Sequence, residues 1–181
     1  PPLSAEVLKA INSAFYGVPK KITSVFQAIN LLGMNTVKNL ALSFSLVKNF
    51  RTEPLAAFDY TCFWKDSLIG AVAMKFLAEK ILPDFSEDAF FLGLLHNIGI
   101  LTLLQCIPKQ YSLVLQEMEI SGYDYHEVEE QILGFTHMAV GEYLAKTWGL
   151  PEIFQTPIGC HHHPAGADFV DKDSEKLAKI L

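Results

Sequence analysis

Residues 89–107, AFFLGLLHNIGILTLLQCI, form the only long uncharged run of the chain and decide its fold class. The run is long enough to cross a bilayer if it forms a single helix. His96 and Asn97 lie at its middle, however, where hydrocarbon would penalise their polar side chains, and Gly93 and Gly99 interrupt it. We therefore predict two helices that are buried in a protein core and do not enter a membrane.

Apolar residues recur at helical spacing on both sides of this run, and no convincing period-two alternation is found between turn signals. The pattern predicts an all-α, multi-helix bundle. A long helix is expected over 58–82, followed by one that Ser86 caps and that carries His96. Glycines at 122, 134 and 149 are typical helix stops, and we expect further helices at roughly 108–120, 125–133, 137–148 and 151–160.

The first part of the chain predicts three shorter helices. Ser4 is expected to cap the first, Ser24 and Gln27 to form a capping box on the second, and Asn35 to cap the third. We expect residues 1–50 to form a small N-terminal helical lobe and residues 57–181 a second one. Arg51–Ala56, which contains Pro54, is the expected connection within a single domain over 1–181.

Charge and cysteine usage exclude several classes of protein. The chain has 14 basic and 20 acidic residues and a net charge of −6, which argues against broad phosphate-driven binding of nucleic acid. Its three cysteines, Cys62, Cys106 and Cys160, are odd in number and widely spaced, so no disulfide framework is indicated. With no signal-peptide pattern at the N-terminus, we expect a cytoplasmic protein.

The histidines are distributed unevenly, because all six lie at or beyond His96. Imidazole is a common ligand of divalent transition metals, carboxylates complete such sites, and helical bundles build them from facing helices. The candidate ligands of such a site are Asp66, His96, His137, His161 and His162.

The alternative is that these histidines only satisfy hydrogen bonds. His137 directly follows the expected Thr136 cap, and the His161–His163 run ends an apolar helix, where imidazoles can meet free carbonyls. We expect His126 to be exposed, because Glu127, Glu129 and Glu130 surround it, and exclude it from the site.

Ordered motifs along the chain resemble those of HDOD domains, relatives of the HD and HD-GYP phosphohydrolases. The N-terminal half carries Asn12-Ser13-Ala14-Phe15-Tyr16-Gly17 and Ala28-Ile29-Asn30-Leu31-Leu32-Gly33. The second half carries Phe63-Trp64-Lys65-Asp66-Ser67, Gly93-Leu94-Leu95-His96-Asn97-Ile98-Gly99, Gly134-Phe135-Thr136-His137, Trp148-Gly149-Leu150-Pro151 and His161-His162-His163-Pro164. The resemblance covers nearly the whole chain and implies an HD-like bundle that lacks some of the family's terminal helices.

The resemblance also implies a degenerate metal site. Active HD and HD-GYP proteins have a histidine at the position matching Asp66 and an aspartate at the position matching Asn97, with further ligands matching His137, His161 and His162. An asparagine cannot supply an anionic bridging carboxylate. We therefore expect a non-catalytic bacterial signalling domain that binds a protein partner or small ligand, requires no cofactor and retains a remnant divalent transition-metal site. The alternative is a metal-dependent phosphohydrolase or cyclic dinucleotide phosphodiesterase.

Overall fold

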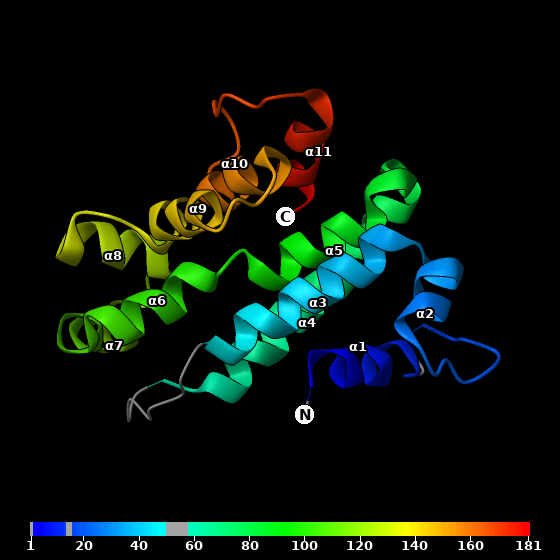
Figure 1. Cartoon of the computed structure of the whole chain (residues 1–181). Helices are drawn as coiled ribbons and strands as arrows, with labels where there is room; N and C mark the ends of the chain where they lie inside the picture. The colour runs from blue at the N-terminus through cyan, green and yellow to red at the C-terminus, as the bar shows by residue number, and fades with distance from the viewer. Residues whose placement is uncertain (1, 14–15, 50–57) are drawn as a thin grey trace. The chain divides into compact units, whose positions relative to one another are not determined.

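The computed structural model describes residues 2–13, 16–49 and 58–181, which form helices and connecting loops without a strand in those ranges (Figure 1). The predicted all-α class is therefore confirmed. The chain divides into two compact units, residues 1–49 and residues 50–181. The expected connection, Arg51–Ala56, lies outside the described residues.

The first unit consists of α1 (Leu3–Ile11), α2 (Val25–Leu32) and α3 (Met34–Asn49). The side chain of Asn12 fastens the end of α1 to the following loop, since its Nδ2 donates to the carbonyls of Leu8 and Ile22 and its Oδ1 accepts from the Ile22 amide. The three helices enclose a small apolar core of Val7, Ile11, Ile22, Ala28, Val37 and Leu40.

Capping in this unit differs in part from the prediction. Ser24 does cap α2, because its hydroxyl accepts from the Gln27 amide, although the Gln27 side chain accepts from Thr23 rather than from Ser24. The expectations for Ser4 and Asn35 are wrong: α1 begins at Leu3 and α3 begins at Met34, so both residues are already helical. Each helix begins two residues earlier than its polar cap signal indicated.

The second unit begins with the long helix α4 (Tyr60–Ile81), which Asp59 caps by accepting from the amides of Thr61 and Cys62. A short 3-10 turn, η1 (Pro83–Phe85), leads into the remaining helices. These are α5 (Ser86–Leu95), α6 (Ile98–Cys106), α7 (Pro108–Ser121), α8 (Tyr125–Leu133), α9 (His137–Thr147), α10 (Glu152–Cys160) and α11 (Lys172–Ile180).

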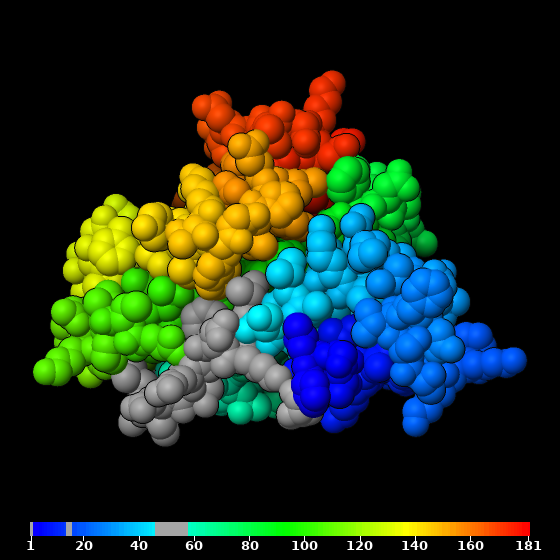
Figure 2. Space-filling model, in the orientation of Figure 1, coloured from blue at the N-terminus to red at the C-terminus, as the bar shows by residue number. Residues whose placement is uncertain are grey.

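Helices α5 and α6 form the centre of this unit. Among the described residues, Pro83–Cys106 is the one stretch long and apolar enough to span a membrane, but 67% of its most apolar window is buried inside the structure. Helix α4 packs on α5, α6 on α9, α9 on α10, and α10 on α11. In the space-filling view, α9, α10 and α11 form one continuous packed surface (Figure 2). The apolar run thus forms core, as predicted.

Helix ends in this unit follow the glycine signals more closely than the cap signals. Gly122, Gly134 and Gly149 all have positive φ angles beyond the ends of α7, α8 and α9, as predicted. Ser86 is the first residue of α5 and makes no capping hydrogen bond, because the 3-10 turn already leads into the helix. His96 caps the C-terminus of α5 instead of lying within it.

Two glycines allow the core helices to approach each other very closely. A Cβ atom on Gly93 of α5 would lie 2.7 Å from the Cα of Ala71 on α4. A Cβ atom on Gly99 of α6 would lie 2.0 Å from the carbonyl oxygen of His137 on α9. Only glycine fits at these distances. The second contact sets the position of the His137 backbone against α6.

Candidate metal centre

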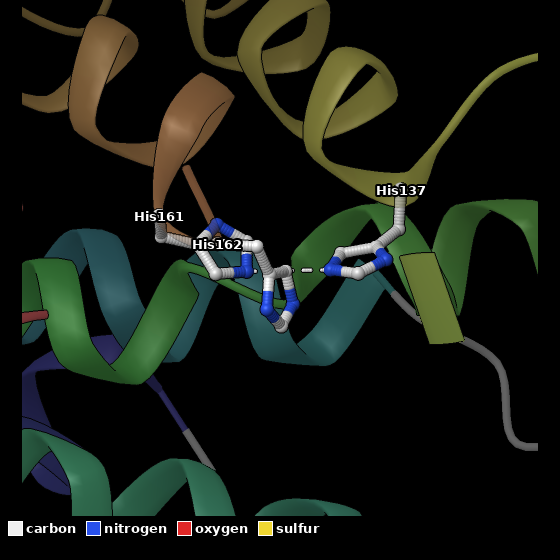
Figure 3. A group of neighbouring side chains, drawn as sticks. All are labelled: His137, His161 and His162. Carbon is white, nitrogen blue, oxygen red and sulfur yellow. Dashed lines mark hydrogen bonds between the residues drawn. The ribbon is translucent and has the colours of Figure 1, made fainter. Parts of the chain in front are cut away.

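Three imidazoles converge where the start of α9 meets the end of α10. His137 is the first residue of α9, His161 caps the C-terminus of α10, and His162 follows it. One ring nitrogen from each of the three lies within 4.8 Å of the others, and Figure 3 shows the rings gathered between the two helices. We call His137, His161 and His162 the three-histidine group.

The Nδ1 atoms of His137 and His161 are both held by oxygen acceptors. In His137, Nδ1 lies 2.7 Å from Oε2 of Glu129, and in His161 it lies 2.9 Å from the carbonyl oxygen of Ile158. Because a carbonyl or carboxylate oxygen accepts a hydrogen bond, each Nδ1 carries the proton that it donates. The Nε2 atom of each neutral ring is therefore left with a free lone pair.

These two lone-pair nitrogens face each other. Nε2 of His137 lies 3.3 Å from Nε2 of His161, a contact drawn as a dashed line in Figure 3. Two bare lone pairs repel at this distance unless a cation lies between them. Two nitrogens bound to a tetrahedral zinc at about 2.0–2.1 Å are themselves about 3.3 Å apart. Donor set and spacing both fit a divalent transition metal.

His96 lies at the edge of this group. Its ring packs edge-on against His161 with 5.0 Å between centroids, and its Nδ1 is 2.7 Å from the carbonyl oxygen of Gly93. The same argument assigns the proton to Nδ1 and a free lone pair to Nε2. The structure thus brings His96 next to His161, outside the three-histidine group itself.

Burial keeps the imidazoles of His96, His161 and His162 neutral. Desolvation, with a smaller contribution from neighbouring histidines, lowers the pKa of His96 to about 4 and that of His161 to about 2. Desolvation, followed by His137 and His126, lowers the pKa of the more exposed His162 to about 4. Metal ligation requires a neutral imidazole, so these rings are available as ligands near pH 7.

Glu129 is the functional residue that sequence reasoning missed. Its side chain is fully buried, and Oε2 accepts from the backbone amide of His137 at 2.6 Å as well as facing the ring. Its Oε1 accepts from the hydroxyl of Tyr111 at 2.6 Å. Burial, then the charge of Glu129, raises the pKa of Tyr111. A carboxylate behind a histidine ligand fixes its tautomer and increases its basicity, as in many zinc sites.

The substitution Glu129→Gln tests this role. The amide keeps the shape and can accept from His137 and donate to Tyr111, but it removes the negative charge behind the ring. We expect the affinity for Zn²⁺ to fall by about 10–100-fold. Competition with a chelating dye measures the change, and Glu130→Gln, an exposed position one residue on, is the matched control. Equal affinities in the two variants would contradict a metal-directed role of Glu129.

Asp66 and Asn97 lie apart from the three-histidine group. Asp66 is exposed on α4, and Asn97 lies at the junction of α5 and α6; both line one pocket of the second unit. The Oδ1 atom of Asn97 is buried and has no hydrogen-bond partner among the described residues. The structure therefore places these two residues near each other but not among the imidazoles that face one another.

His126, which we expected to be exposed, is half-buried beside the group. Its ring stacks on His162 with 4.2 Å between centroids and 19° between planes. The acidic neighbours that suggested exposure do not share one environment, because Glu127 is exposed and Glu129 is buried. Helical spacing would have placed residues 126 and 129 on similar faces, but the presence of glutamate at 127, 129 and 130 concealed which one faces inward.

Comparison with known proteins agrees with this architecture. The family model of the HDOD domain matches residues 1–164. An HDOD domain protein of unknown function from Geobacter sulfurreducens is 25% identical, with a TM-score of 0.84 over 97% of this chain and 59% of that protein.

Two further solved structures are similar. A Shewanella amazonensis protein, provisionally named a phosphohydrolase, is 28% identical. Its TM-score is 0.79 over 98% of this chain and 62% of that protein. The response regulator MmoQ from Methylococcus capsulatus is 27% identical, with a TM-score of 0.59 over 98% of this chain and 69% of that protein. The chain spans about three fifths of the length of the Geobacter and Shewanella proteins.

Proposed function

The chain belongs to the HDOD domain family, and from this premise we propose that it is a regulatory domain of bacterial signal transduction that binds a protein partner or small ligand without hydrolysing it. A response regulator among the similar structures supports a signalling role. Because a fold of this kind hosts several functions, the residues of the site decide whether hydrolysis is possible.

The observation that carries the proposal is the kind of ligand that the site offers. Among the described residues, the group that converges for a metal consists of imidazoles alone. Glu129 stands behind His137 and also binds Tyr111, while Asp66 lies outside the group and Asn97 is uncharged. A two-metal hydrolase needs carboxylate charge to hold both ions and help activate water. This donor set supports one metal ion at most.

We propose that His137, His161 and His162 hold this ion, with His96 beside them. A bound divalent ion supplies positive charge there. The chain's own residues do the rest: Glu129 and the carbonyl of Ile158 orient the rings, and the apolar helices α5 and α6 limit access of water. Because α9 and α10 each contribute ligands, their junction gains rigidity when the site is filled.

The competing function is a phosphohydrolase or cyclic dinucleotide phosphodiesterase. The provisional name of the Shewanella amazonensis protein favours it, since that protein is 28% identical and covers 98% of this chain. In such an enzyme Asp66 would join the histidines as a ligand and Asn97 would be tolerated through its amide oxygen. Assays with cyclic dinucleotides and simple phosphate esters separate the two functions.

Restoring the residues that the hydrolases carry, with Asp66→His and Asn97→Asp, should raise metal affinity more than hydrolytic rate. A carboxylate and an imidazole add ligands directly, so we expect affinity for Mn²⁺ or Zn²⁺ to increase by about tenfold. Catalysis also needs an open coordination position and a substrate pocket, so turnover should change by less than about twofold. Metal titration beside phosphodiesterase assays of parent and double variant measures both quantities.

The two single variants serve as controls for this comparison, because each restores one ligand without the other. Efficient turnover by the parent protein would contradict the regulatory proposal. So would a large gain in turnover without any gain in metal affinity, since it would show that the catalytic machinery is intact.

We also propose a cytoplasmic location. Cys62 and Cys106 are exposed and Cys160 is half-buried, and all three are free. Free, accessible thiols suit a reducing compartment. The net charge of −6 continues to argue against nucleic acid as the partner.

A further inference from the structure

The second unit contains a pocket of about 420 Å³ near the junction of α5 and α6. Its lining comes from the residues just before α4, the first turns of α4, the α5–α6 junction, α6, α7 and the first residue of α8. The volume is sufficient for a small organic group or a long amino-acid side chain.

The walls of the pocket are largely apolar and partly aromatic. Ile100, Leu115 and Met118 contribute aliphatic and thioether surface, and Phe58 and Phe63 contribute rings whose centroids lie 5.8 Å apart. Aromatic faces are negative at their centre and attract cations. An occupant with an apolar stem and a flat or positive end would match these walls.

The charged residues among the described lining of the pocket all have the same sign. Asp59, Asp66 and Glu119 line it, and none of the lining residues that the structure describes is a lysine or an arginine. Lys65 is the basic residue that acts on Asp59 from outside the lining, and it lowers the pKa of that carboxyl less than the amides of Cys62 and Thr61 do. An anionic phosphate ester would be repelled here, whereas a cation would be attracted.

Asn97 also lines the pocket, although its Oδ1 atom is closed off from solvent. Its Oδ1 atom has no hydrogen-bond partner among the described residues, although an unpaired buried acceptor is costly. The polar groups that the pocket does present to solvent include the three exposed carboxylates, which accept hydrogen bonds. A ligand that satisfies them must therefore present donors.

We propose that this pocket binds a guanidinium group, carried by an arginine side chain of a partner protein or by a small guanidine. Guanidinium offers five N–H donors and no acceptor, binds carboxylates through two parallel hydrogen bonds and stacks on aromatic rings. The inference rests on the proposed function, since it names the ligand class of a domain that binds without hydrolysing.

The test compares two probes with blocked, uncharged termini, N-acetylarginine amide and N-acetylcitrulline amide. They differ only in the side-chain end, because the ureido group of citrulline has nearly the shape of guanidinium without its charge. Calorimetric titration of the full chain should show the arginine probe binding at least about tenfold more tightly. Raising the ionic strength should weaken its binding, because the carboxylates are exposed. Propylguanidine, a free guanidine with a single positive charge, tells whether a small molecule suffices or the peptide-like backbone adds affinity.

Variants of the lining locate the site. Asp66→Asn and Glu119→Gln should each weaken the arginine probe by about fivefold, because each removes one partly exposed ion-pair partner. Glu152→Gln removes the same charge from an exposed position on α10, outside the pocket, and should change nothing. Thermal melts check the fold of each variant, and the arginine-to-citrulline ratio in the parent provides a measurement independent of mutation.

Equal binding of the two probes, unchanged binding in both pocket variants, or tighter binding of a phosphate ester would each overturn the guanidinium assignment. None of these results bears on hydrolysis by itself. Turnover of a phosphodiester would instead overturn the proposed regulatory function. The two hypotheses therefore fail by different measurements.

Discussion

The variant His96→Ala/His161→Ala is expected to lose at least about 100-fold in affinity for a divalent transition metal while remaining folded. His161 contributes one of the two Nε2 atoms that face each other at 3.3 Å, and His96 packs against its ring. Losing the His161 ligand together with the neighbouring His96 ring should cost more than the 10–100-fold typical of a residue that supports a ligand. Elemental analysis after metal loading, followed by dye competition, measures the loss.

Folding and location provide the controls for this variant. Neither side chain is among the fully buried core residues, so the helical circular dichroism should be retained. His163→Ala removes an exposed imidazole next to the three-histidine group and should leave metal content unchanged. If the parent protein holds no metal under metal-replete conditions, the histidines serve only as hydrogen-bonding groups, and the metal proposal is wrong.

Among the substitutions of glycine by alanine, Gly99→Ala should cause the largest loss of stability. The added Cβ atom would lie 2.0 Å from the carbonyl oxygen of His137 and 3.0 Å from the amide nitrogen of Gly141, so backbone must move against backbone. We expect a loss of about 3 kcal/mol in stability and a melting temperature lower by about 6–12 °C. Because the clash displaces His137, metal affinity should fall as well.

Gly70→Ala is the matched control. A Cβ atom there would meet the carbonyl oxygen of Gly93 at 3.7 Å and Cε1 of His96 at 3.8 Å, which are ordinary contacts. Alanine also favours the helical conformation of α4, so its stability should change by about 1 kcal/mol or less. Thermal unfolding of the two variants side by side measures the difference; similar melting temperatures would contradict the close approach of α6 and α9.

The sequence predicted the fold class and many helix ends because these depend on local chemistry. Gly134 and Gly149 mark ends through their positive φ angles, and α8 runs over the predicted residues 125–133. The prediction of helix starts failed where a preceding turn leads directly into the helix, as at Ser86. Helix α11 was not predicted, because its mean composition is polar and its inward residues Leu177 and Ala178 are few.

The site was predictable only in its ligand types. Local signals placed His137 after Thr136 and His161 at the end of α10, but which imidazoles meet depends on the packing of α9 against α10. The roles of Glu129 and His126 depend on which side of α8 faces the core, and the short, charged sequence of α8 does not reveal this. Participation of Asp66 in metal binding stays a prediction.

The supports of the imidazoles differ in how they can be changed by mutation. Nδ1 of His96 and Nδ1 of His161 each hydrogen-bond to the main-chain carbonyl three residues earlier, and every amino acid supplies such a carbonyl. Nδ1 of His137 hydrogen-bonds instead to the side chain of Glu129, which in turn accepts from the hydroxyl of Tyr111. Two supports are therefore encoded by helix geometry alone and persist through sequence drift. Only the support of His137 depends on side chains, so a substitution at position 129 or 111 can change the chemistry behind that ring without altering the backbone.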